Sequence, residues 1–291
     1  MEAGVSNSEK EIQIVDKRLV NYATESLQLH FEVENNLMKV HIFEPKEKEI
    51  LAFQLVDLST DYFEFDAQKL SDFFKTSPLK LESNFQKVSL SLITSQFTLV
   101  PNALFIKEKA TDYLLAASSI SEGSVILTKE INFLNAFAVF AMPSTLKEIL
   151  DKQFTTIEYF PHAAPTYLSL YNLFKTEKEP VVFVNIHSQH YDIIVFEDSQ
   201  LKLFTVHPIL TTEDFLYYSF YTLEQLKINA GTAAVYLMGE VEKNSAIHEI
   251  LIKYFKKSSW ILKSSQYKLG YELNDINPYF YFSHFSQYLC V

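Results

Sequence analysis

The stretch FVNIHSQHYDIIVF, residues 183–196, contains two apolar strand-forming runs separated by a short polar turn. The turn region holds Asn185, His187, Ser188 and His190. In nucleotide-binding proteins, a turn after a buried strand often cradles phosphate, and glycine lets its backbone N–H groups approach the ligand. The stretch therefore allows three interpretations: a phosphate loop without its glycines, a metal site made of histidines, or a turn with only a structural role.

The region around this stretch predicts three strands, a helix, a strand and a second helix, in that order, and then a further strand. Runs of β-branched and aromatic residues favour strands, and apolar residues spaced three and four apart favour helices. The spacing of Thr211 and Asp214 is typical of a helix start, and Gly231 is expected to stop that helix after about residue 230. The expected strands are 181–186, 193–196, 201–206, 234–238 and 258–262, and the second helix lies within 244–256.

The first half of the chain repeats this order. Its expected strands are 27–33, 37–43, 50–55 and 88–93, with helices around residues 70–74 and 107–117. An insertion at about residues 121–160 separates the two copies and is expected to hold strands at 125–131, 137–141 and 154–159 and a helix after Pro143. A helix at 163–174 connects the insertion to the second half.

This organisation predicts two lobes. Residues 1–25 are expected to form a mobile arm, residues 26–175 a first lobe that contains the insertion, and residues 176–291 a second lobe. The polar run KTEKEP, residues 175–180, marks the boundary between them. We expect the aromatic segment 277–291 to dock as a final strand or helix rather than to form an exposed binding strip.

The composition argues against several classes of function. The formal net charge is −11, whereas nucleic-acid binding depends on cationic side chains, so neither a nucleic-acid partner nor a nuclease is expected. The single cysteine, Cys290, excludes an internal disulfide and a cysteine-based zinc site. The start of the chain is too polar for a signal peptide, and no apolar run is long enough to span a bilayer. We expect a cytoplasmic protein without membrane insertion.

The duplicated order of elements resembles the actin-like ATPase superfamily, whose two lobes are ribonuclease-H-like. Residues 185–196 resemble the second phosphate loop of the pilus-assembly and cell-division actin-like proteins. LFTVHPILTTEDF (203–215) resembles their next strand and helix, and VYLMGEV (235–241) resembles the strand that ends at their adenosine pocket. Residues 135–172 are similar to their insertion subdomain.

The whole chain also resembles an uncharacterised bacterial family of unknown function with this fold, in which nucleotide sites are degraded. The resemblance implies an α/β protein with two ribonuclease-H-like (actin-like ATPase) lobes. Each lobe is expected to be a mixed five-stranded sheet with flanking helices, and a small α+β subdomain is expected to be inserted.

The residues at the motif positions depart from the pattern of the superfamily. Asn185 replaces the phosphate-loop aspartate, and His187 replaces the loop glycine. Leu210-Thr211 or Thr211-Thr212 replaces the glycine pair before the helix, and Gly239-Glu240 replaces the Gly-Gly of the adenosine pocket. The whole chain has only five glycines.

The first loop, VENN (33–36), also lacks glycine, although Glu32 or Glu34 stands in for its acid. Each lost hydrogen bond to a charged group costs about 1.5–3 kcal/mol, and several such losses would remove micromolar affinity, which is worth about 8 kcal/mol. The resemblance therefore implies a vestigial nucleotide cleft at Glu32, Asn35, Asn185, His187, Ser188, Thr211, Gly239 and Glu240.

The motif H-x-x-H-x-D at His187, His190 and Asp192 contains the donor types that zinc and iron prefer. We expect residues of a strand–turn–strand to project to different sides, so no metal is predicted. His162, in the run YFPHAAP, is expected at a helix start rather than as a catalytic base. A nucleophile elbow of the form G-x-S-x-G does not occur in the sequence, and no catalytic residue is predicted.

The sequence thus favours a non-catalytic actin-like protein, a pseudo-ATPase without cofactor that acts as a scaffold for an unidentified protein partner. A homodimer is also compatible with it. The alternative is a working ATPase or kinase with atypical phosphate loops, in which Glu32, Asn185 and Asp192 surround ATP-bound magnesium. A third possibility is an enzyme with a new site between the lobes.

Overall fold

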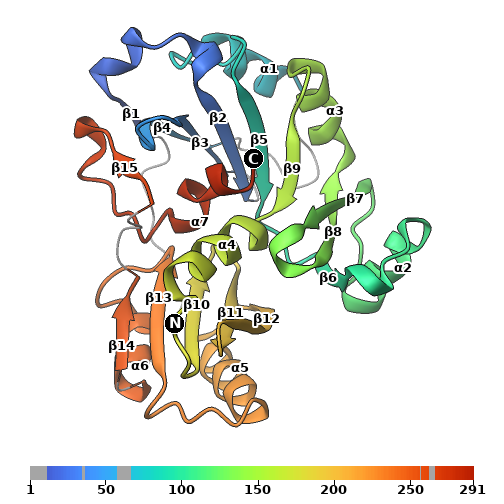
Figure 1. Ribbon diagram of the computed structural model, residues 1–291, viewed down its shortest axis with the longest axis vertical. Coiled ribbons are helices and arrows are strands. Elements are labelled where there is room, and N and C mark those ends of the chain that lie inside the picture. The colour runs from blue at the N-terminus through green and yellow to red at the C-terminus, as the bar shows by residue number, and fades with distance from the viewer. Residues whose placement is uncertain (1–11, 35–36, 58–66, 256, 262–265) are drawn as a thin grey trace. The chain divides into compact units, whose positions relative to one another are not determined.

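The computed structural model describes residues 12–34, 37–57, 67–255, 257–261 and 266–291 (Figure 1). The chain forms two compact units. Among the described residues, the five-stranded unit takes 169–255, 257–261 and 277–282. The seven-stranded unit takes 12–34, 37–57, 67–168, 266–276 and 283–291. The boundary between them falls inside helix α4 (Ala163–Phe174), which has the predicted limits.

The five-stranded unit contains one mixed sheet with the strand order β12-β11-β10-β13-β14. β10, β11 and β12 form an antiparallel meander, and β13 and β14 add parallel strands beside β10. The strands are β10 (Val181–Ile186), β11 (His190–Glu197), β12 (Gln200–Pro208), β13 (Ala234–Gly239) and β14 (Lys257–Trp260). All five predicted strands are therefore present, with β10 confirmed residue for residue.

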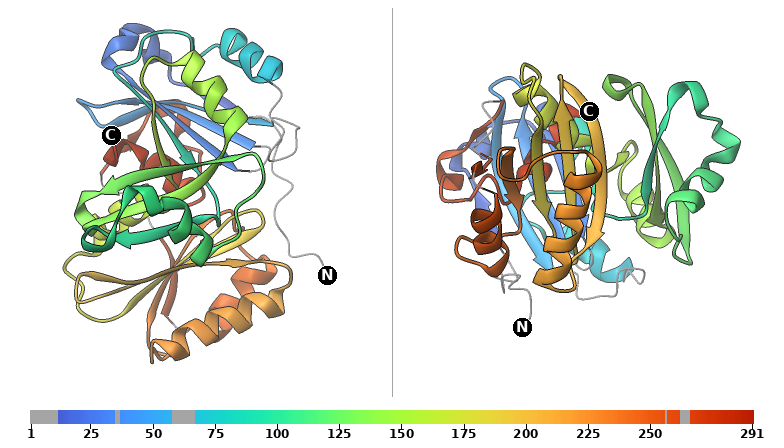
Figure 2. Two further views of the ribbon diagram at one scale, coloured as in Figure 1. Left: turned by 90° about the vertical axis from the view of Figure 1, so that its right-hand side faces the viewer. Right: turned by 90° about the horizontal axis from the view of Figure 1, so that it is seen from below.

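Helices α5 (Thr212–Gln225) and α6 (Ala246–Tyr254) cover one face of this sheet (Figure 2). Phe215 of α5 and Leu251 of α6 join the buried core of that face. The predicted end of α5 near residue 230 is wrong, because Lys227 adopts a positive φ of 58° and its N–H bonds to Glu224 O. The helix thus stops before Gly231 without using it.

The seven-stranded unit contains a sheet of order β1-β4-β3-β2-β5-β9, in which β15 also pairs with β4. Its strands are β1 (Ile12–Val15), β2 (Gln28–Glu34), β3 (Leu37–Glu44), β4 (Glu49–Asp57), β5 (Lys87–Leu92), β9 (Glu158–Pro161) and β15 (Lys268–Leu269). This sheet is larger than the predicted five strands because β1 and β15 extend it. β9 starts later than the expected strand 154–159 and pairs in parallel with β5 rather than within the insertion.

The two faces of the seven-stranded sheet differ in polarity. Helices α1 (Ala67–Thr76) and α3 (Ser144–Gln153) pack on an apolar face whose core includes Phe31 and Phe74. The C-terminal helix α7 (Phe282–Phe285) brings His284 and Phe285 against the other face. The aromatic segment thus docks as a helix, but from residue 283 it belongs to this unit rather than to the predicted lobe 176–291.

A three-stranded sheet of order β6-β8-β7 completes the seven-stranded unit. It consists of β6 (Phe97–Pro101), β7 (Ser124–Ile131) and β8 (Ala136–Pro143), and α2 (Ala110–Ala117) packs on it through Leu114. The sequence does not predict β6, which is short and half-exposed. Short 3-10 helices occur at Lys17–Asn21, Thr24–Ser26, Asn102–Leu104, Lys107–Lys109, Asn132–Leu134, Tyr271–Leu273 and Gln287–Leu289.

The predicted mobile arm, residues 1–25, falls partly outside the described residues, which begin at residue 12. From there on the segment is structured, because β1 pairs with β4 and Asp16 accepts hydrogen bonds from Arg18 and from the Tyr271 N–H. Across the part of the chain that the structure describes, no helix combines the length and apolarity needed to cross a bilayer.

Candidate functional site

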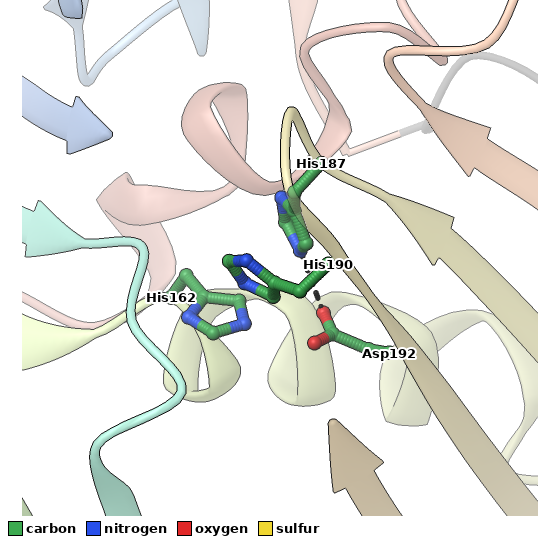
Figure 3. Close-up of side chains that lie close together, drawn as sticks. All are labelled: His162, His187, His190 and Asp192. Atoms are coloured by element: carbon green, nitrogen blue, oxygen red, sulfur yellow. Dashed lines mark hydrogen bonds and ion pairs between the residues drawn. The ribbon is translucent and has the colours of Figure 1, made fainter. Parts of the chain in front are cut away.

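The β10–β11 hairpin is the centre of the candidate site (Figure 3). Asn185 pairs with Asp192 across the two strands, and the His187 N–H donates to His190 O at 2.9 Å. A turn of two residues, Ser188 and Gln189, therefore closes the hairpin. Directly paired residues share one face of a sheet, and residues two apart along a strand share it too. Asn185, His187, His190 and Asp192 thus lie on the same face.

Hydrogen bonds connect three of these side chains. His187 Nε2 lies 2.8 Å from Asp192 Oδ2, and the Asn185 amide donates to the same oxygen at 3.0 Å. Asn185 Nδ2 also lies 3.0 Å from His187 Nε2. Asp192 is fully buried, and the other two side chains are nearly so. These three side chains form a buried polar network.

The prediction that His187, His190 and Asp192 project to different sides is wrong. Their nitrogen and oxygen donor atoms lie within 4.8 Å of one another, and the rings of the two histidines are 4.7 Å apart. The two-residue turn explains the difference, because it makes His187 and His190 a cross-strand pair. His162, the fourth side chain drawn in Figure 3, belongs to the seven-stranded unit.

Gly239 ends β13 and Glu240 follows it, beside the same hairpin. Gly239 pairs with Ile186 and adopts φ of +86°, and a Cβ built on it would lie 2.1 Å from Ile186 O and 2.7 Å from Asn185 Oδ1. The Glu240 N–H donates to Ile186 O at 2.8 Å, and the Gly239 N–H donates to Tyr279 O at 2.9 Å. The glycine is needed here because β10 packs directly against it.

Thr211 and Ser188 occupy the margins of this region. Thr211 is the N-cap of α5, and its hydroxyl accepts the Asp214 N–H, as its spacing predicts. Ser188 lies half-buried in the hairpin turn. The backbone joins the two segments where the Ile209 N–H donates to Gln189 O at 2.9 Å. The five-stranded unit therefore gathers Asn185, His187, Ser188, Gly239 and Glu240, with Thr211 two residues beyond Ile209.

The remaining predicted residues belong to the seven-stranded unit. Glu32 is buried on β2, where its carboxylate lies 3.2 Å from Lys39 Nζ on β3. Asn35 lies outside the described residues. His162 is buried next to the start of α4, and the Thr94 N–H donates to its Nδ1 at 3.4 Å. This placement agrees with the expected helix start.

Sequence reasoning missed a cluster of buried polar side chains near Glu32. His30 bonds to Ser89 Oγ at 2.7 Å, and its ring lies 4.7 Å from that of His41. His41 bonds to His284 at 3.0 Å. Burial lowers the pKa of His30 to about 3, and it holds the pKa of His41 and His284 well below the usual range.

A signal for this cluster was present in the alternation of β2 and β3. Polar side chains recur at every second position on one face of each strand, opposite the apolar core, and strict alternation places such residues together. These are Gln28, His30, Glu32 and Glu34 on β2 and Lys39 and His41 on β3.

Comparison with solved structures identifies the fold. A Bacteroides thetaiotaomicron protein with an actin-like ATPase fold and unknown function superposes with a TM-score of 0.72 at 18% identity, over 82% of this chain and 91% of that one. A chain of the PilM–PilN type IV pilus biogenesis complex superposes with a TM-score of 0.56 at 11% identity, over 84% of this chain and 90% of that one. The predicted actin-like fold is confirmed.

Sequence comparison supplies the family. No curated protein matches the sequence. The model of one family matches residues 16–258, and its members are described as "Protein of unknown function (DUF3822)". The resemblance to a family of unknown function with this fold is therefore correct, and the chain belongs to the DUF3822 family.

Proposed function

We propose that this chain is an actin-like protein that has lost its nucleotide site and acts by binding another protein. The loss of the nucleotide site is supported by three backbone N–H groups at the predicted phosphate positions, which already donate to carbonyl oxygens of the chain. His187 donates to His190 O, Gly239 to Tyr279 O and Glu240 to Ile186 O. A phosphate held by backbone needs such donors for itself.

The side chains at the hairpin support the same conclusion. Asn185 and His187 are already bonded to Asp192, so a phosphate at these side chains would have to break a buried polar network. The space beside the Gly239 Cα, where a nucleotide could approach a glycine, is occupied by the Ile186 backbone of β10. Glu240 adds a carboxylate beside this position, and a carboxylate repels phosphate.

Isothermal titration of the full chain with ATP and MgCl₂ tests the loss of the nucleotide site. We expect no binding tighter than about 10 μM, which corresponds to about 7 kcal/mol. Tighter binding that is weakened in Asp192→Asn would instead support the alternative of a working ATPase. An ATP hydrolysis assay on the same two proteins then distinguishes nucleotide turnover from binding alone.

Support for protein binding comes from an exposed aromatic surface on α5. Tyr217 and Tyr221 are 63% and 50% exposed, and their rings stack at 6.1 Å. Phe220, Leu216 and Tyr254 complete a pocket in this surface. Clustered exposed aromatics are unusual on a monomer and are typical of protein interfaces. The similar PilM–PilN structure is itself a complex of two proteins.

Affinity capture with crosslinking tests the second half of the proposal. We expect the wild-type chain to retain a specific protein and the double variant Tyr217→Ser/Tyr221→Ser to lose it. Tyr271→Ser is a matched control, because Tyr271 is 81% exposed in the seven-stranded unit. Equal capture by all three chains would argue against the α5 surface. Sedimentation analysis shows whether the retained protein is a second copy of this chain.

A further inference from the structure

The geometry points to a site for one divalent transition-metal ion, bound by His187, His190 and Asp192 of the β10–β11 hairpin. The register of the hairpin places all three side chains on one face, and their donor atoms lie within 4.8 Å of one another. This inference goes beyond the proposed function and differs from the sequence-based expectation of no metal, which assumed that the side chains diverge.

The spacing of the donor atoms suits a small ion. Ligand atoms about 2.1 Å from one zinc ion lie about 3.4 Å apart in a tetrahedral site. His187 Nε2 and Asp192 Oδ2 are already 2.8 Å apart, and the His190 ring lies 4.7 Å from that of His187. The donor atoms, all within 4.8 Å of one another, are therefore near enough for side-chain rotation to bring them to one ion.

The donor types select the class of metal. Two imidazoles and one carboxylate suit zinc, iron, cobalt and nickel, whereas magnesium and calcium prefer oxygen ligands alone. Three protein ligands also leave at least one coordination position for water or another ligand. The ion is thus expected to be a transition metal of intermediate softness, for which Zn²⁺ and Co²⁺ are suitable probes.

The surroundings resemble the support that metal ligands need. The Asn185 amide donates to the Asp192 carboxylate and fixes its orientation, as outer partners of metal ligands commonly do. Asp192 and His187 are buried, so their attraction to a cation is weakly screened. His190 is half-buried beside them.

Binding would exchange a proton for the ion. In the metal-free hairpin, the hydrogen bond between His187 Nε2 and Asp192 Oδ2 needs a proton between these atoms. An ion bound to Nε2 takes the place of that proton. A neutral ring then carries its one proton on Nδ1, whereas a doubly protonated ring keeps the Nδ1 proton and releases the Nε2 proton to solvent. Metal affinity should therefore fall as the pH is lowered.

Titration of the full-length chain with ZnCl₂, and separately with CoCl₂, tests the site. We expect one ion per chain with a Kd below about 1 μM, together with visible absorption bands from bound Co²⁺. His190→Ala and Asp192→Asn should each weaken binding by at least about a hundredfold, more than the loss of an outer partner. His248→Gln removes a histidine elsewhere in the same unit and should retain full affinity.

Two results would overturn the site. One is a wild-type chain that binds no ion stoichiometrically. The other is binding that His190→Ala and Asp192→Asn leave unchanged, or that His248→Gln weakens equally, because the ion would then sit elsewhere. Circular dichroism of each metal-free variant confirms its fold, and a wild-type chain that binds no ion overturns the site even where a variant fails to fold.

Discussion

His41 Nδ1 lies 3.0 Å from Nε2 of His284, so two imidazoles 243 positions apart in the sequence share one hydrogen bond. Both side chains are fully buried in the seven-stranded unit, and His30 lies beside them. A hydrogen bond between two neutral rings needs one donor and one acceptor nitrogen. Protonating either ring buries a charge, and protonating the accepting nitrogen also breaks the hydrogen bond. Burial therefore favours the neutral form of the cluster.

The first prediction concerns pH. The folded-state pKa of His30 is about 3, below the unfolded value near 6.5, and burial shifts those of His41 and His284 in the same direction. The unfolded chain therefore takes up protons below pH 6.5 while the folded chain does not, and stability falls as the pH falls toward 3. Each histidine that stays neutral in the folded chain lowers the unfolding free energy at pH 5.5 by about 1.4 kcal/mol, compared with a pH well above 6.5.

Urea unfolding followed by circular dichroism at pH 7.5 and 5.5 measures this effect. We expect the unfolding free energy to fall by about 4 kcal/mol when all three histidines contribute. His284→Gln should reduce this pH dependence, since one of the three proton acceptors is absent from the unfolded state. Equal stability at the two pH values would show that the histidines are protonated in the folded chain.

The sequence contained enough information for most of the five-stranded unit. The run of residues 181–186 is uniformly apolar except for Asn185, as a buried central strand requires, and β10 has these limits. The convergence of His187, His190 and Asp192 could be predicted only together with the register of the hairpin. It follows once the turn is assigned two residues, but Ser188-Gln189 is not a typical two-residue hairpin sequence, so composition alone does not fix the register.

Other features depend on contacts between distant segments. β15 consists of only Lys268 and Leu269, and it exists because it pairs with β4. The burial of His284 likewise depends on β3, more than two hundred residues earlier. Local periodicity carries no signal for such pairings, since a two-residue strand has no period. The pairing of β1 with β4 is likewise a contact between distant segments, so the polar composition of residues 12–25 did not predict that they are structured.

The second prediction tests the close packing of Gly239 against β10. Gly239→Ala should destabilise the chain by about 3 kcal/mol, because the left-handed φ and the overlap with Ile186 O both carry a cost. Gly123→Ala is a matched control: Gly123 also has a positive φ, of +74°, but a Cβ there meets no atom within 4 Å. It should cost only about 1 kcal/mol. Urea unfolding curves of the two variants compare them directly, and similar losses would mean that β10 can move away from residue 239.

The third prediction concerns Asp16, which lies in the segment expected to be a mobile arm. Its carboxylate accepts hydrogen bonds from Arg18 and from the Tyr271 N–H, and the Arg18 guanidinium holds the pKa of Asp16 far below its usual range. Asp16→Ala should therefore lower the unfolding free energy by about 2–3 kcal/mol. The loss should be measurable at pH 7, because a carboxyl group with a depressed pKa stabilises the fold above its unfolded pKa and loses this effect in acid.

Hydrogen exchange followed by mass spectrometry provides an independent check on Asp16. Peptides from β1 and from residues 268–273 should lose protection together in Asp16→Ala, because the carboxylate connects these two segments. Val20→Ala serves as a control in the same segment, since Val20 is 88% exposed. Unchanged protection of residues 268–273 in Asp16→Ala would show that β15 holds that segment without the carboxylate.

The last prediction tests whether α5 is held at its start by Thr211. The hydroxyl of this residue accepts the Asp214 N–H at 3.1 Å and thereby satisfies one of the open donors of the first turn. Thr211→Ala should lower the unfolding free energy by about 1 kcal/mol, whereas Thr211→Asn, which preserves a capping acceptor, should cost far less. Thermal unfolding of the three chains measures these losses, and equal unfolding of all three would show that the Thr211 hydroxyl does not hold the start of α5.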